Sequence, residues 1–295
     1  MINSIKKHIP QWLILARRKV LLFLKVFTKQ NLQRKRMIPI LHIHLADHCN
    51  LNCKGCDNFS PISPKVFADI SVFEKDCARI STLTNGKIGE MQLLGGEPLL
   101  HRQTVDFLAI ARKYFPTVPI KIVTNGVLLP QQTDEFWKSC VENRIEIVVT
   151  KYPISTDYDA IRNLARAKGV AFSFYGNTEF VTKTLQCIPL DLHGKQDATG
   201  SFLRCNRANH CVALDNGKLY TCSLIPYIKY FNTRFGKNLT ISNNDFLDIY
   251  NIKNQDEILD FLCKPMPFCR YCNIKGIINN VEYGISKQEI TEWTI

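Results

Sequence analysis

Acidic residues are absent from the first 46 positions of the 295-residue chain. The same stretch holds ten lysines and arginines, so it carries most of the formal net charge of +12. Without these ten cations the rest of the chain has a net charge of about +2. The body of the chain is therefore nearly neutral, and no nucleic-acid partner is expected.

The basic segment, residues 1–36, also lacks the uninterrupted apolar run of roughly 20 residues that a membrane-spanning helix needs. Its stretch WLILARRKVLLFLKVF places apolar residues at helical spacing, with cations on the remaining face. This pattern is typical of an amphipathic helix on an anionic membrane surface. A helix that packs on the body of the protein or on a partner subunit, or an organellar transit peptide, would fit the same residues.

A secretory signal, with its short apolar core and small-residue cleavage site, is missing as well. No internal repeat or low-complexity tract stands out. The twelve cysteines fall into close groups, which favours metal or iron–sulfur binding in a reducing compartment over a disulfide framework. We therefore expect a cytoplasmic protein, with peripheral membrane contact if the N-terminal helix binds lipid.

Strand-like and helix-like stretches alternate after Arg36, in the order expected of repeated βα units. Five or six such units are too few for a closed eight-stranded barrel and fit an open one. The predicted fold class is α/β, a partial (β/α)6-type open TIM barrel with a small cysteine-rich C-terminal extension. The predicted domains are a basic segment at residues 1–36, the barrel core at 37–186 and the extension at 187–295.

Three cysteines lie close together in HCNLNCKGC, directly after the first predicted strand. They are Cys49, Cys53 and Cys56, in the spacing C-x3-C-x2-C. In a cubane of four irons and four sulfides each iron takes one outside ligand, so three thiolates leave one iron open for a substrate. The carboxyl end of a barrel strand is where such folds hold their chemistry.

This loop resembles that of the radical S-adenosylmethionine superfamily, and the resemblance covers about residues 38–185. It implies that Cys49, Cys53 and Cys56 hold a catalytic [4Fe-4S] cluster whose open iron binds S-adenosylmethionine. It further implies reductive cleavage of that cofactor to a 5′-deoxyadenosyl radical, which removes a hydrogen atom from a C–H bond. A flavodoxin or ferredoxin is the electron donor expected by resemblance.

Two further motifs support the resemblance. LLGGEPLL, after the second strand, looks like the family's GGEP motif, which would assign Gly95, Gly96, Glu97 and Pro98 to the amino group of the methionine moiety. The alternative for these residues is an ordinary strand-to-helix turn. TNGVLL ends the third strand, where relatives place ribose contacts, which would assign Thr124 and Asn125; a bare Asn-Gly turn fits as well.

One position departs from the family pattern. Relatives usually carry an aromatic residue before the third cysteine, and this chain has Gly55 there. We expect Phe59 to supply the adenine contact instead.

The C-terminal extension contains a second group of cysteines. A hairpin with its turn at Asn216–Gly217 would bring Cys205 and Cys222 together. The spacing is similar to the single-cluster twitch form of the SPASM extension, which implies one auxiliary [4Fe-4S] cluster. Structural zinc is the alternative. The candidate ligands, of which four would bind, are Cys205, Cys211, Cys222, Cys269 and Cys272.

The remaining cysteines and two histidines have less distinctive settings. Cys77 and Cys140 are expected to be buried small hydrophobes. Cys187 and Cys263 are unligated thiols or donors of a hydrogen atom to a substrate radical. His42 and His44 alternate along the first strand, where they line the barrel interior or occupy satisfied core sites.

The expected function is a radical enzyme that oxidises or epimerises a carbohydrate-type or glycan-linked small molecule. The alternatives are a ribosomal peptide maturase of the SPASM type and, from another class, a non-catalytic iron–sulfur or zinc scaffold.

Overall fold

The computed structural model describes residues 37–177 and 185–294. Most of its strands pair in parallel, and they are rich in β-branched residues and leucine. The strands are β1 (Ile40–Ala46), β2 (Glu90–Gly95), β3 (Ile120–Thr124), β4 (Ile145–Val149), β5 (Ala171–Phe174), β6 (Leu185–Cys187), β7 (Cys211–Asp215), β8 (Lys218–Tyr220), β9 (Leu247–Asp248) and β10 (Ile278–Val281).

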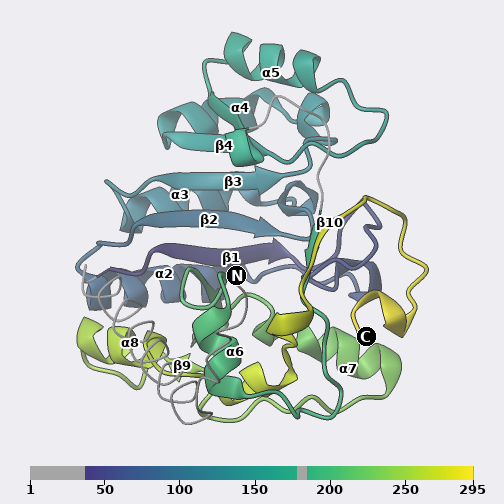
Figure 1. Ribbon diagram of the computed structural model, residues 1–295. Coiled ribbons are helices and arrows are strands. Elements are labelled where there is room, and N and C mark those ends of the chain that lie inside the picture. The colour runs from purple at the N-terminus through teal and green to yellow at the C-terminus, as the bar shows by residue number, and fades with distance from the viewer. Residues whose placement is uncertain (1–36, 178–184, 295) are drawn as a thin grey trace, which may run out of the picture.

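Eight of these strands form one sheet in the order β5-β4-β3-β2-β1-β7-β8-β9, and β10 pairs with β6. All neighbours from β5 to β7 run parallel, and β8 and β9 continue the sheet in antiparallel fashion. The predicted α/β fold with an open, partial barrel is thus confirmed (Figure 1). The sixth parallel strand, β7, comes from the cysteine-rich extension, so the sheet continues past the change of composition at residue 187.

Helix α2 (Ile70–Thr84) begins at a side-chain cap that satisfies its first backbone N–H groups. Asp69 Oδ1 accepts hydrogen bonds from the amides of Ser71 (2.8 Å) and Val72 (3.0 Å), and Asn85 ends the same helix in a left-handed conformation. The helices are α2 (Ile70–Thr84), α3 (Thr104–Tyr114), α4 (Asp134–Glu142), α5 (Tyr158–Ala167), α6 (Ala198–Arg204), α7 (Ile228–Phe235) and α8 (Gln255–Leu262).

Strand β1 is buried on both faces, as expected in a parallel sheet. Leu41 and Ile43 belong to the main core, which lies between the sheet and the helices that follow its strands. His42 and His44 alternate with them and face the other side. A second core, centred on Tyr227 and Phe231, lies on that side, where α7 extends beyond β1 (Figure 1).

The predicted hairpin is present as β7 and β8, joined at Asn216–Gly217. The buried carboxylate of Asp76 on α2 accepts hydrogen bonds from the amide of Gly217 (2.8 Å) and the hydroxyl of Tyr250 (2.6 Å). These contacts hold the extension against the barrel.

No helix within the described ranges has the length and apolar character to cross a membrane. The amphipathic helix predicted in residues 1–36 lies outside the residues that the structure describes.

Candidate active site

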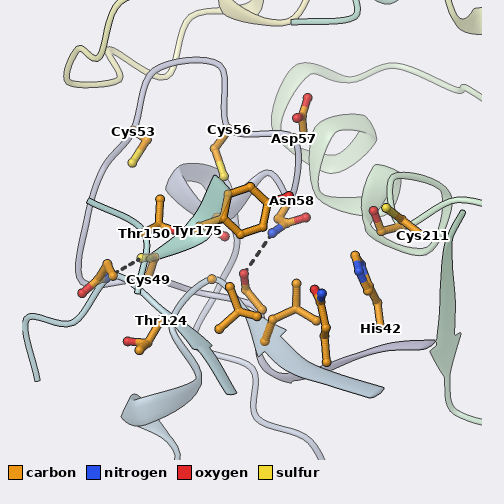
Figure 2. A pocket seen from close by; sticks show the side chains of 18 of the residues that line it. His42, Cys49, Cys53, Cys56, Asp57, Asn58, Thr124, Thr150, Tyr175 and Cys211 are labelled. Carbon is orange, nitrogen blue, oxygen red and sulfur yellow. Dashed lines mark hydrogen bonds between the residues drawn. The ribbon is translucent and has the colours of Figure 1, made fainter. Parts of the chain in front are cut away.

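A cavity of about 560 Å³ opens at the carboxyl ends of the parallel strands. The three cysteines of the β1 loop, Cys49, Cys53 and Cys56, all line it (Figure 2). None of the twelve cysteines is in a disulfide. The structure therefore brings the predicted cluster ligands together on one wall as reduced thiols.

The donors of this wall fit an iron–sulfur cluster. Burial, together with the negative charges of Glu97 and the other two cysteines, raises the pKa of Cys49 to about 12. The thiol is thus protonated at neutral pH, and a bound cation would displace the proton. The backbone amide of Leu51 donates to the Cys49 sulfur over 3.3 Å, and the side-chain amide of Asn125 does so over 3.8 Å. Such donors stabilise a thiolate and tune the potential of a cluster bound to it.

Gly95 and Gly96 permit a close approach between two segments of the chain. A Cβ at Gly95 would lie 2.1 Å from the carbonyl oxygen of Ala46, and one at Gly96 would lie 2.2 Å from that of His48. The amide of Gly96 donates to the Ala46 carbonyl over 2.8 Å. The two glycines therefore press the end of β2 against the start of the cysteine loop, and both also line the cavity.

Glu97 is fully buried behind the cavity wall, next to the buried Pro98. Its Oε1 accepts hydrogen bonds from Thr124 Oγ1 (2.6 Å) and the Leu99 amide (3.1 Å), and its Oε2 accepts one from the Asn125 amide (2.9 Å). Burial outweighs these donors and raises the pKa of Glu97 to about 7. Its carboxyl group joins the ends of β2 and β3, and its predicted contact with an ammonium group stays a prediction.

Thr124 and Asn125 reach the cavity from the end of β3, as the sequence predicts. The side chain of Asn125 donates to Asn50 Oδ1 over 2.7 Å, and its Oδ1 accepts from the Val127 amide over 2.9 Å. These bonds fix Asn125 beside Cys49. The role of Thr124 and Asn125 in binding ribose stays a prediction.

Phe59 occupies a different place from the one that an adenine contact requires. It is fully buried in the second core, where its ring packs against Phe231 and Trp293 at centroid distances of 5.8 and 6.0 Å. It does not line the cavity, because the chain turns inward at Phe59 with φ of 55°. The aromatic residues on the cavity wall are Tyr152 and Tyr175, and Tyr175 lies beside Cys56 in Figure 2.

The end of the cavity away from the three cysteines is polar (Figure 2). His42 lies there on β1, and its Nδ1 is buried without a hydrogen-bond partner. Burial, followed by the charges of His44 and His210, lowers the pKa of His42 to about 4, so the imidazole is neutral at pH 7. Other polar side chains that line the cavity are those of Gln92, Asn206, Arg207, His210 and Ser223.

The five candidate ligands in the extension act on one another electrostatically. Burial, with the charges of Cys269, Cys222 and Cys205, raises the pKa of Cys272. Burial, followed by the charge of Cys205, raises the pKa of Cys222 as well. Burial and the charge of Cys205, against that of Arg207, also raise the pKa of Cys211, which lines the cavity on the side of His42 (Figure 2). Which four of the five cysteines bind an auxiliary cluster stays a prediction.

No three Cys, His, Asp or Glu side chains converge on a position for a single metal ion within residues 37–177 and 185–294. A four-iron cluster distributes its ligands over separate irons, so such convergence is not required of it.

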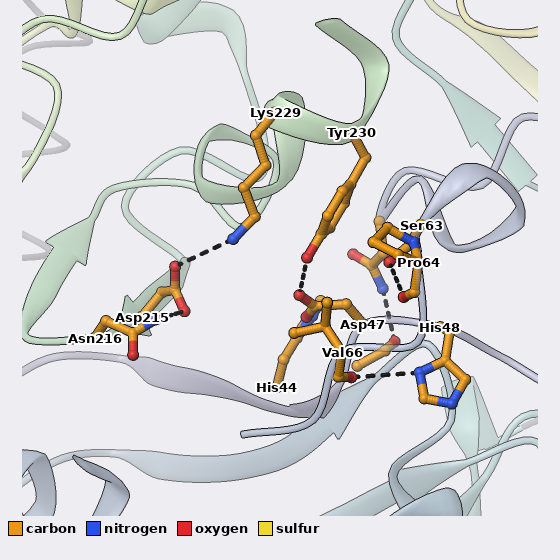
Figure 3. A network of polar contacts seen from close by, with 12 residues as sticks. His44, Asp47, His48, Ser63, Pro64, Val66, Asp215, Asn216, Lys229 and Tyr230 are labelled. Carbon is orange, nitrogen blue, oxygen red and sulfur yellow. Dashed lines mark hydrogen bonds and ion pairs between the residues drawn. The ribbon is translucent and has the colours of Figure 1, made fainter. Parts of the chain in front are cut away.

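His44 takes no part in the cavity and lies in a buried network beneath α7 (Figure 3). Its Nδ1 is 3.1 Å from Asp47 Oδ1, and its ring stacks on Tyr227 at 3.8 Å. The hydroxyl of Tyr230 donates to the other oxygen of Asp47. Although burial opposes ionisation, hydrogen bonds from His44 and Tyr230 hold the pKa of Asp47 below its usual value. This network fastens α7 to the start of the cysteine loop.

The remaining cysteines divide as their sequence settings suggest. Cys77 and Cys140 are fully buried, which confirms the prediction that they are small core residues. Cys187 and Cys263 do not line the cavity, so their position gives no support to a role as hydrogen-atom donors.

Residues 43–170 match the family model described as the radical SAM superfamily. This part, 128 of the 295 residues, is similar to the radical SAM superfamily. Among curated relatives, a GTP 3′,8-cyclase of Alkaliphilus oremlandii is 25% identical over 157 residues, which are 53% of this chain and 48% of that protein. A GTP 3′,8-cyclase of Paenarthrobacter nicotinovorans is 33% identical over 97 residues, which are 31% of this chain and 26% of the relative. The chain thus matches less than half the length of these two proteins.

A solved structure, that of BtrN in complex with AdoMet and 2-DOIA, superposes with a TM-score of 0.50 at 16% identity. The superposition covers 88% of this chain and 99% of BtrN. The likeness shows that the radical SAM region and the extension share the fold of that protein.

The sequence motifs of the radical SAM region did not reveal several residues of the cavity. His42 gave a signal, because it alternates with apolar residues on β1. Tyr152, Arg207 and His210 lie in loops and Tyr175 begins a short 3-10 helix, all without a recognisable spacing, and only the fold places them at the cavity.

Proposed function

We propose that the protein is a radical S-adenosylmethionine enzyme that removes a hydrogen atom from a carbohydrate-type or glycan-linked small molecule and so oxidises or epimerises it. The observation that carries the proposal is a cavity lined both by three thiols and by uncharged hydrogen-bonding side chains, among them Gln92, Asn206 and Ser223. The match of residues 43–170 to the radical SAM family supports the first half of this statement.

Cys49, Cys53 and Cys56 would hold a [4Fe-4S] cluster, which would supply radical chemistry when S-adenosylmethionine is bound. The chain's own residues place the two reactants in one cavity and exclude water from between them. Asn125 is held beside Cys49 by its hydrogen bond to Asn50, so it lies where it can orient a polar cofactor group. Tyr152 and Tyr175 offer aromatic surface for a base.

The polar end favours an uncharged, hydroxylated substrate over a nucleoside triphosphate. Arg207 is the sole lysine or arginine among the described residues that line the cavity. Its guanidinium already donates to Asp57 (2.6 Å) and to the Gln186 carbonyl (2.8 Å). Recognition of several phosphates calls for more cations than one that is already paired. Gln92, Asn206 and Ser223 instead suit hydroxyl groups.

An oxidation that begins with loss of a hydrogen atom must also release a proton and an electron. His42 is neutral and faces the cavity with an unpartnered Nδ1, so it can accept the proton. Cys205, Cys222, Cys269 and Cys272 would hold an auxiliary [4Fe-4S] cluster, which supplies an electron acceptor. In an epimerisation the hydrogen atom is returned from the opposite face, and Cys211 is a thiol on the cavity wall.

The test begins with anaerobic protein whose clusters have been reconstituted. Reduced protein with S-adenosylmethionine should form 5′-deoxyadenosine, and Cys53→Ala should abolish this product. Cys140→Ala is the matched control, because it removes a buried thiol from α4 far from the loop and should leave the product unchanged. No product from wild-type protein with a verified reduced cluster would favour a non-catalytic scaffold.

The substrate class is tested by the transfer of deuterium into 5′-deoxyadenosine. Deuterated sugars and sugar alcohols are compared with deuterated peptides and with GTP. We expect label from the carbohydrate set alone, with a flavodoxin or ferredoxin tested in place of the chemical reductant. Label from peptides alone would support a SPASM-type maturase, and label from GTP alone would align the protein with its curated relatives.

A further inference from the structure

The C-terminal segment, residues 284–293, lies across the three-cysteine loop, and we call it the C-terminal strap. An antiparallel bridge joins Cys53 to Ile285. The amide of Lys54 donates to the Gly284 carbonyl over 2.8 Å, and the amide of Ser286 donates to the Asn52 carbonyl over 2.8 Å. The strap thus pairs with the loop as a short strand. The pairing lies at the end of the sheet where the carboxyl ends of the parallel strands are found (Figure 1).

Two side chains of the strap extend this contact to the third cysteine. Trp293 Nε1 donates to the carbonyl of Cys56 over 2.9 Å. Glu292 Oε2 accepts from the amide of Gly55 over 3.3 Å. Four of the five residues from Asn52 to Cys56 therefore have a backbone hydrogen bond to the strap.

Both side chains are themselves held in place. Glu292 is 7% exposed, and its carboxylate also accepts from Ser286 Oγ (2.7 Å) and from the amides of Lys287 (2.6 Å) and Glu289 (3.4 Å). Trp293 is 3% exposed, and its ring packs on Phe59 and Phe235 at centroid distances of 6.0 and 5.8 Å. A buried carboxylate whose four lone-pair sites are used and a packed indole are rigid supports.

The strap also accounts for the glycine that departs from the family pattern. Gly55 has φ of +64°, and a Cβ there would lie 3.1 Å from the carbonyl oxygen of Glu292. A side chain at this position would meet both backbone strain and the strap. The space beside the third cysteine is therefore occupied by Glu292 and Trp293 rather than by a residue of the loop.

We propose that Glu292 and Trp293 are positioning residues, which hold the three-cysteine loop in the shape that its cluster requires. The inference rests on the proposed function only in naming the ligand of the loop. The effect of the strap on the loop itself is independent of catalysis, and this separates the two in an experiment.

The test uses the full chain in both metal-free and reconstituted form. Trp293→Phe keeps the aromatic packing and removes only the donor to Cys56, and Glu292→Gln replaces a carboxylate oxygen with an amide that faces other donors. Trp293→Phe leaves the Cys56 carbonyl with the Phe59 amide as its donor, and Glu292→Gln weakens the hydrogen bond from the Gly55 amide. Amide hydrogen exchange in residues 49–58 should therefore become about tenfold faster. The reconstituted variants should also lose iron to a chelator about tenfold faster and show an altered EPR response to S-adenosylmethionine.

Trp137→Phe is the matched control, because Trp137 is an indole on α4 that is 3% exposed and lies in the main core. It should leave exchange in residues 49–58 and the rate of iron loss unchanged. The inference is overturned if both strap variants exchange like wild type in residues 49–58, or if Trp137→Phe loosens the loop equally. If wild-type protein binds no cluster at these cysteines, the proposed function fails, while the exchange experiment on metal-free chain still decides the role of the strap.

Discussion

Arg207 and Asp57 form an ion pair between the two groups of cysteines, with 2.6 Å between Nη1 and Oδ2. Asp57 directly follows Cys56 in the three-cysteine loop. The backbone amide of Arg207 donates to the sulfur of Cys205 over 3.4 Å. One residue therefore contacts a ligand of the second group with its backbone and the loop of the first group with its side chain.

The first prediction concerns the strength of this pair. Its side chains are 21% and 32% exposed, so solvent screens part of the attraction. A double-mutant cycle with Arg207→Met and Asp57→Asn should give a coupling energy of about 1 kcal/mol, between the values for exposed and buried pairs. The measurement is urea unfolding of the metal-free chain under reducing conditions.

The ion pair of Lys168 and Asp134 is the control, because the Asp134 side chain is 91% exposed. Its coupling energy should be close to zero. Additive effects at Arg207 and Asp57, within about 0.4 kcal/mol, would contradict a link between the cysteine groups.

The second prediction concerns the ligands of the auxiliary cluster. Cys272→Ser should lower the iron content of reconstituted protein by about one cluster, because we propose Cys272, with Cys205, Cys222 and Cys269, as its ligands. Cys211→Ser should keep the iron content of wild type, because Cys211 lines the cavity instead. Iron and acid-labile sulfide per chain are the readouts. Loss of iron from Cys211→Ser with full iron in one of the other variants would reassign the ligand set.

Much of the fold could be predicted because its local patterns agree with the tertiary structure. The strand at β1 and the hairpin at Asn216–Gly217 follow from apolar periodicity and turn chemistry. The return of β7 to pair with β1 could not be predicted, because the five residues Cys211–Asp215 carry no signal for a partner distant in sequence.

The candidate site shows the same division. Cys49, Cys53 and Cys56 are close together in sequence, so their spacing alone predicts that they share one wall of the cavity. Glu292 and Trp293 reach the same loop from more than 230 residues away, and nothing in their local sequence indicates this contact. Proximity to Cys56 along the chain predicts that Phe59 contacts adenine, but its left-handed backbone turns the ring into the second core.

The third prediction concerns the pH dependence of stability through Glu97. Its pKa in the folded protein is raised from 4.5 to about 7, mainly by burial. The folded state therefore keeps a proton that the unfolded state loses, and the contribution of Glu97 to the free energy of unfolding falls as pH rises from about 4.5 to about 7. A shift of this size corresponds to about 3 kcal/mol at most.

Glu97→Gln mimics the protonated carboxyl and removes this fall. As pH rises from about 4.5 to about 7, the free energy of unfolding of the metal-free variant, minus that of metal-free wild type, should increase. Parallel curves for the two proteins would show that Glu97 ionises alike in the folded and unfolded states.

The last prediction concerns His42, whose pKa is lowered from 6.5 to about 4 by burial and by the charges of His44 and His210, against a hydrogen bond with Gln92. Here the unfolded state binds a proton that the folded state does not, so stability is present above pH 6.5 and is lost as pH falls toward 4. The effect is opposite in sign to that of Glu97 and similar in size, about 3 kcal/mol at most.

In wild type the contributions of Glu97 and His42 nearly cancel. His42→Gln should therefore leave a free energy of unfolding that falls steeply from pH 4.5 to 7, and Glu97→Gln one that rises. Urea unfolding of both metal-free variants across this range tests the relation, and slopes of the same sign would refute a neutral His42 facing the cavity.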